Sequence, residues 1–143
     1  MTIKQALKHK NKLAQKINET YAKVSMYNSM EEGQERPYDV ESQLNEYFNL
    51  TKELVELKSK IHTANQPVYS KIFELSELKS QVSKLKDLDC TEGKMRYRYS
   101  EEGYMTKTAV ISIVERDAMV SKLQDLIEIV QEGLDVHNAT THI

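Results

Sequence analysis

The sequence predicts a mainly α-helical protein with long, antiparallel, coiled-coil-like helices, about four in number, and a small β-hairpin inserted before the last helix. Apolar residues recur at spacings of three and four along charged segments, which is the pattern of amphipathic helices. One short segment near residue 95 alternates between basic and other side chains, which is the pattern of a strand. The length of 143 residues fits a single domain over residues 1–143.

A helical hairpin is expected over residues 2–65. The chain turns between its two helices around Gly33 and Pro37, where the apolar spacing stops. The second helix ends near Asn65, because asparagine tolerates the left-handed conformation and Pro67 cannot continue a helix. The predicted stripe of the first helix is Ile3, Leu7, Ala14, Ile17, Tyr21, Val24 and Asn28. The predicted stripe of the second is Val40, Leu44, Tyr47, Thr51, Leu54, Lys58 and Ile61, widened by Leu50 and Leu57.

The remaining elements follow in order along the chain. A third helix is expected over residues 70–88, and a β-hairpin over residues 94–110 with its turn at 100–103. The last helix is expected over residues 113–136. Ser112 and Glu115 have the spacing of a capping box at its start. Apolar side chains at helical spacing give this helix one face, formed by Ile113, Val120, Leu123, Ile127, Val130 and Leu134.

Charge is segregated along the chain. Residues 1–30 contain six lysines and one glutamate, a net charge of +5, whereas residues 31–66 contain eight acidic and four basic side chains, a net charge of −4. A lysine-rich helix is one way to bind nucleic acid. Here an acidic helix of similar length follows directly, so we expect pairing between helices, within or between subunits, and no nucleic-acid partner.

Several function classes find no support in the sequence. No apolar run approaches the roughly 20 residues that span a bilayer, and the first residues lack a signal peptide, so a cytoplasmic protein is expected, without a membrane partner. Cys90 is the single cysteine, and acidic neighbours disfavour its thiolate. His137 and His142 do not share a helical face, so no metal site is expected. We expect no enzyme and no cofactor.

Residues 94–100 are the most informative segment. Alternation in a strand would place Lys94, Arg96 and Arg98 on one side, with Met95, Tyr97 and Tyr99 on the other. Arginine binds phosphate through paired hydrogen bonds, and tyrosine stacks on bases. The alternative is structural: the tyrosines pack on the helices, and the arginines are solvated or pair with acidic residues 101 and 102.

A ligand site formed between subunits would add polar residues at helix ends to the hairpin. The full set of candidate ligand-binding residues is Arg96, Arg98, Tyr97, Tyr99, Lys107, Asn65, Asn138, Thr140 and Thr141. Such a site would take a small anion, for example one derived from a nucleotide.

Several short segments in this order resemble a known family. They are Ala6-Leu7 with Leu13 and Ile17, residues 57–65, residues 78–88, Arg98-Tyr99-Ser100 and the ending Asn138-Ala139-Thr140-Thr141. Over nearly the whole chain they resemble the septicolysin-like family of short, uncharacterised bacterial and phage proteins. The resemblance implies a mostly helical fold and brings no established activity with it.

The function expected from the sequence is that of a non-enzymatic homo-oligomer that captures a small anionic, nucleotide-like ligand, as a phage-encoded sequestering protein would. The alternative is a structural or assembly protein whose coiled-coil helices dock on partner helices. The two hypotheses differ in what the hairpin arginines do. Membrane action, which the family name suggests, has no sufficiently apolar segment to support it.

Overall fold

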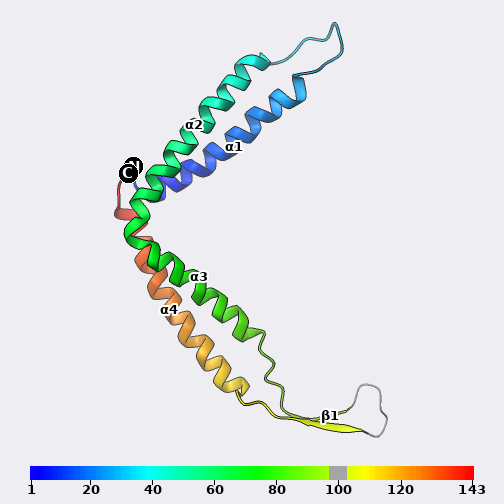
Figure 1. Cartoon of the computed structure of the whole chain (residues 1–143), viewed down its shortest axis with the longest axis vertical. Coiled ribbons are helices and arrows are strands. Elements are labelled where there is room, and N and C mark those ends of the chain that lie inside the picture. The colour runs from blue at the N-terminus through cyan, green and yellow to red at the C-terminus, as the bar shows by residue number, and fades with distance from the viewer. Residues whose placement is uncertain (97–102) are drawn as a thin grey trace. The chain divides into compact units, whose positions relative to one another are not determined.

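A computed structural model describes residues 1–96 and 103–143 of the chain (Figure 1). Contacts divide the chain into two compact units. Unit 1 comprises Met1–Pro67 and Val136–Ile143, and unit 2 comprises Val68–Asp135. Each unit is described by itself below. The expectation of one domain over residues 1–143 stays a prediction.

The prediction of a mainly helical chain with a small antiparallel hairpin before the last helix is confirmed. The elements are α1 (Ile3–Tyr27), α2 (Val40–Asn65), the 3-10 turn η1 (Gln66–Val68), α3 (Tyr69–Lys86), β1 (Gly93–Arg96), β2 (Tyr104–Lys107) and α4 (Ile113–Thr140). The expected bounds of the helices and the hairpin differ from these mainly at their ends.

The second helix ends at Asn65, as expected, but no loop follows it. The elements α2, η1 and α3 follow one another directly, so the described part of the chain has three helical stretches where about four were expected. Proline lacks an N–H group, but an N–H is not needed in the first turn of a helix, so Pro67 fits within η1. The backbone N–H of Gln66 donates to the carbonyl of Thr63 in a tightened turn.

Side chains cap the starts of the long helices. At α1, the backbone N–H of Gln5 donates to Thr2 Oγ1 at 3.2 Å, and the N–H of Thr2 donates to Gln5 Oε1 at 2.9 Å. The capping box predicted at α4 is confirmed: the Glu115 N–H donates to Ser112 Oγ at 3.1 Å, and the Ser112 N–H donates to Glu115 Oε2 at 3.2 Å. These bonds fix where each helix begins.

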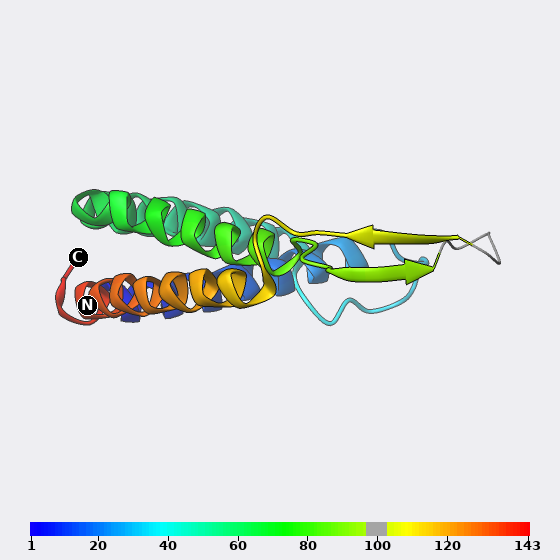
Figure 2. The ribbon, with the colours of Figure 1, turned by 90° about the horizontal axis from the view of Figure 1, so that it is seen from below.

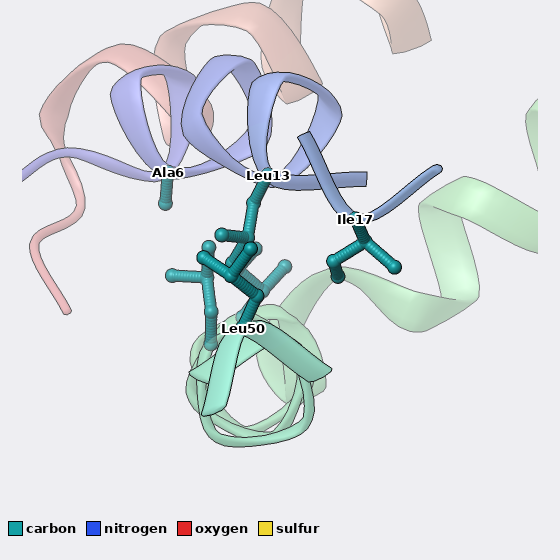
Figure 3. Close-up of a cluster of buried hydrophobic side chains, with 6 residues drawn as sticks. Ala6, Leu13, Ile17 and Leu50 are labelled. Carbon is teal, nitrogen blue, oxygen red and sulfur yellow. The ribbon is translucent and has the colours of Figure 1, made fainter. Parts of the chain in front are cut away.

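In unit 1, α1 and α2 pack against each other through a buried apolar cluster, which Figure 3 shows between the two helices. The cluster consists of Ala6, Leu13, Ile17, Leu50, Leu57 and Ile61. Its spacing of seven and then four residues along both helices is that of a coiled-coil seam. Leu50 and Leu57 therefore lie in the seam, not at its edge as expected.

The predicted stripe of α1 was shifted by one residue at part of its length. The buried positions include Ala6, Leu13 and Thr20, whereas Tyr21 is half exposed. Thr20 can be buried because its hydroxyl donates to the carbonyl of Lys16 at 2.8 Å. An internal hydrogen bond thus makes a polar residue acceptable where the sequence pattern favoured its larger neighbour.

The end of the chain closes unit 1 against its beginning. Thr2 and His142 form an antiparallel β-bridge, the Ile3 N–H donates to the carbonyl of Thr141 at 2.9 Å, and the Ile143 N–H donates to that of Met1 at 3.0 Å. The two ends accordingly lie close together in Figures 1 and 2. Ile3 is fully buried, and Ile143 packs against the apolar cluster.

In unit 2, α3 buries Leu78 and Val82, and α4 buries Val120 and Leu134 of its predicted face, whereas Ile113 of that face is exposed. Arg116 joins the ends of these helices, since its Nη1 donates to the carbonyls of Lys86 (3.4 Å) and Leu88 (3.3 Å). A cation is favourable at the C-terminal end of α3, where carbonyls lack helical partners. The hairpin connects the two helices at this end of the unit.

Candidate anion-binding face of the hairpin

The strands β1 and β2 pair antiparallel, with Gly93 opposite Lys107, Lys94 opposite Thr106, Met95 opposite Met105 and Arg96 opposite Tyr104. Gly93 begins β1 with a φ of 113°, a backbone conformation that glycine adopts without strain. Directly opposed residues share a face of the ribbon, and successive residues alternate between faces. The register therefore assigns every described hairpin side chain to one of two faces.

One face, which we call the cationic face, is formed by Lys94, Arg96, Tyr104 and Thr106. All four residues are exposed, and Tyr104 keeps 67% of its surface in contact with solvent. Two cations, a hydroxyl group and an aromatic ring are thus presented together. The alternation predicted for residues 94–96 is confirmed by this arrangement, and Tyr104 is a member that the sequence pattern did not identify.

The other face holds Met95, Met105 and Lys107, all of them half-buried. Lys107 was expected to join the arginines, but the register places it on the opposite side of the ribbon. Its Nζ lies 3.7 Å from Oδ2 of Asp89, with which it forms an ion pair. Lys107 therefore does not belong to the cationic face.

The loop before β1 is organised around Asp89. The Thr91 backbone N–H donates to Asp89 Oδ1 at 2.9 Å, and the Thr91 hydroxyl donates to the same oxygen. These hydrogen bonds, followed by the charge of Lys107, hold the pKa of the Asp89 carboxyl below its ordinary value of 3.8. The carboxylate thus holds the loop together through its hydrogen bonds with Thr91 and joins it to β2 through the ion pair with Lys107.

Acid should loosen this loop locally. Because the pKa of Asp89 is lowered in the folded protein, its contribution to stability is complete above pH 3.8 and is lost as the pH falls through the lowered pKa. We expect the Thr91 amide resonance to shift, and its hydrogen exchange to accelerate, over that acidic range in an NMR titration. Asp89→Asn should abolish the pH dependence, and a Thr91 resonance that still titrates in that variant would contradict the assignment.

The remaining hairpin candidates, Tyr97, Arg98 and Tyr99, lie outside the described residues, as does most of the predicted turn. The helix-end candidates Asn65, Asn138, Thr140 and Thr141 all belong to unit 1. These four helix-end residues therefore lie within the same compact unit. Arg96 and Lys107 belong to unit 2.

Two of the helix-end hydroxyls are engaged in local contacts. The Thr140 hydroxyl donates to the carbonyl of Val136 at 2.8 Å. Thr141 Oγ1 lies 3.1 Å from Nδ1 of His137. Asn65 differs from both, because its side-chain oxygen is shielded from solvent and has no hydrogen-bond partner among the described residues. Of the helix-end set, Asn65 is the better candidate for holding a polar group.

Sequence reasoning missed His137 as a neighbour of these residues, because it weighed the histidine only as a metal ligand. Nε2 of His137 is shielded and likewise has no partner in the described part of the chain. The spacing of four residues between His137 and Thr141 was the available signal, since such residues meet on one side of a helix.

No family model, curated protein or solved structure matches this chain. The resemblance to the septicolysin-like family therefore stays a prediction. Within residues 1–96 and 103–143, no three His, Cys, Asp or Glu side chains are grouped to hold a metal ion. Over the same residues, no helix combines the length and the apolarity that crossing a lipid bilayer demands.

Proposed function

We propose that this protein is a non-enzymatic homo-oligomer that binds a small anionic ligand of the nucleotide type on the cationic face of the hairpin. The observation that supports it best is the pairing of Arg96 with Tyr104 across the two strands. A guanidinium group binds phosphate oxygens, and an exposed ring one strand away offers a surface for a base. Lys94 adds a second positive charge on the same face.

The groups on this face match the parts of a nucleotide. Phosphate needs positively charged donors, which Lys94 and Arg96 supply. A ribose or base edge needs a hydroxyl or amide partner, which Thr106 supplies opposite Lys94. Recognition of a flat, anionic molecule therefore requires no catalytic group.

Isothermal titration against ATP, UMP, cyclic AMP and inorganic phosphate tests this function. We expect Arg96→Ala to weaken binding of a nucleotide at least about tenfold, since a charge-assisted hydrogen bond contributes about 1.5–3 kcal/mol. Tyr104→Ala should reduce the preference for nucleotides over inorganic phosphate, because it removes the stacking surface.

Lys107→Ala is the matched control on the same hairpin. It also removes a cation, but from the opposite face, so nucleotide affinity should change less than twofold. Absence of binding to every nucleotide, or equal losses in Arg96→Ala and Lys107→Ala, would contradict the proposal.

The second candidate function is that of an assembly protein, and exposed apolar side chains on α4 favour it. Leu126, Ile129 and Val136 follow a spacing of three and seven on the exposed side of the helix. If assembly is the whole function, Arg96→Ala leaves the association of the chain unchanged, and neither form binds a nucleotide. The same titration therefore separates the two candidates.

A further inference from the structure

The two flanks of the α1/α2 pair differ in chemistry. Beside the buried seam, one flank carries polar contacts between the helices: His9 Nε2 lies 3.3 Å from Glu53 Oε1, and Lys16 Nζ forms an ion pair with Glu46 Oε1 at 3.3 Å. Such pairs at the edge of a seam are typical of antiparallel coiled coils in water. The polar side chains of this flank are paired with one another and exposed to solvent.

The other side is apolar. We call it the apolar flank and define it by Leu7, Ala14, Tyr21, Leu44, Phe48 and Val55. Helical spacing places these residues away from the ion-paired flank, and three of them keep most or half of their surface open: Tyr21 (50%), Phe48 (58%) and Val55 (63%). Large apolar side chains gathered at one side of a helix pair indicate a surface that another helix covers.

Ring contacts show that α1 and α2 contribute to the flank together. The ring centroids of Tyr21 and Tyr47 are 5.1 Å apart, and those of Tyr47 and Phe48 are 5.5 Å apart. The three rings form a row across the two helices. Aromatic rings are enriched at the centres of protein interfaces, because they offer a large rigid surface.

We propose that the apolar flank joins two copies of this chain, each presenting the same flank to the other. The inference deepens the self-association in the proposed function and does not depend on the hairpin ligand. Two-fold pairing of one surface with itself is the commonest way in which identical chains associate. Such pairing requires that the residues of the flank match those of the same flank on a second copy that runs in the opposite direction.

The sequence of α2 meets that requirement. If two copies of α2 lie antiparallel about an axis between residues 49 and 50, Leu44 of one copy faces Val55 of the other, and Phe48 faces Thr51. Beyond them, the exposed Glu41 faces the exposed Lys58, at both ends of the contact. Apolar residues thus meet apolar or small ones in the middle, and opposite charges meet at the edges.

The size of the contact is sufficient for a specific dimer. Residues 41–58 of α2 extend over about 27 Å, and two helices packed 8–10 Å apart give a face about 20 Å wide. The resulting area is on the order of 500 Å² per copy, or about 1,000 Å² in total, which is at the lower end of specific interfaces. A second copy of unit 1 therefore fits the flank without further elements.

Light scattering of the full chain during size-exclusion chromatography tests the interface. We expect wild type to have at least twice the mass of one chain, and Phe48→Glu to weaken the association about 30-fold or more, as hot-spot residues do. Ser42→Glu is the control, since it places the same charge on an exposed position of α2, one helical turn from Glu46 and away from the apolar flank. Circular dichroism checks that both variants keep their helices.

Charge exchange tests the antiparallel arrangement. Glu41→Lys or Lys58→Glu alone should weaken the association, and the two changes combined should restore it, because each altered end then meets an altered partner. A monomeric wild type, or a Phe48→Glu variant that associates like Ser42→Glu, would overturn the proposal. Loss of nucleotide binding in Arg96→Ala with association unchanged would concern only the hairpin site.

Discussion

Replacing Leu50 with alanine should lower the free energy of unfolding by about 2–5 kcal/mol, one of the two largest effects expected for this protein. The side chain is 5% exposed and lies within the cluster between α1 and α2. Its truncation deletes buried methyl groups and leaves a cavity. The two helices cannot close this cavity, because they are held apart by the packed side chains on either side of it. Chemical denaturation followed by circular dichroism, at one protein concentration, measures the loss.

Lys52→Ala is the control for this measurement. The lysine is exposed two positions further along the same helix, so its truncation should change the free energy of unfolding by less than about 0.5 kcal/mol. Equal losses in the two variants would mean that Leu50 is not part of a packed seam.

Ile3→Ala should have an effect of similar size, about 2–5 kcal/mol, for a different reason. Ile3 is fully buried at the point where the two ends of unit 1 meet, and its N–H donates to the carbonyl of Thr141. Loss of the side chain should loosen this contact as well as the core. Hydrogen exchange at the amides of Ile3 and Ile143 should accelerate along with the drop in stability.

Lys4→Ala serves as the comparison, because the neighbouring lysine is exposed and belongs to the same turn of α1. It should leave both amides protected. If Ile3→Ala lowers stability without changing exchange at Ile143, the chain ends do not depend on this residue.

The helices were predictable because their signals are local. Apolar spacing and the Ser112–Glu115 capping box depend on residues a few positions apart, and the helices and this capping box were found where expected, apart from the helix ends. Which residues of α1 face inward could not be predicted from neighbouring residues alone. Thr20 and Tyr21 are adjacent, and only packing against α2 decides which of them is buried. Hydrophobicity alone favoured the tyrosine, and the hydroxyl bond of Thr20 reversed that preference.

The hairpin shows the same division. Alternation along β1 predicted two faces from neighbouring residues, but which residues of β2 share each face depends on the pairing register. Tyr104 therefore escaped prediction, and the register places Lys107, one of the candidate ligand-binding residues, on the face opposite to Lys94 and Arg96. The helix-end residues were chosen by type, and contacts distant in sequence decide their surroundings. Such contacts have no periodic signal.

The bridge between Thr2 and His142 has a consequence for how the chain is made. The contacts of α1 with α2 form between neighbouring elements and are available early in synthesis, whereas the bridge needs residues from nearly opposite ends of the sequence. Contacts of such long range form slowly, since the whole intervening chain must be brought to closure. Ile3 thus stays without its last backbone partner until Thr141 has left the ribosome. Unit 1 can therefore complete its fold only after the ribosome has synthesised the chain as far as Thr141.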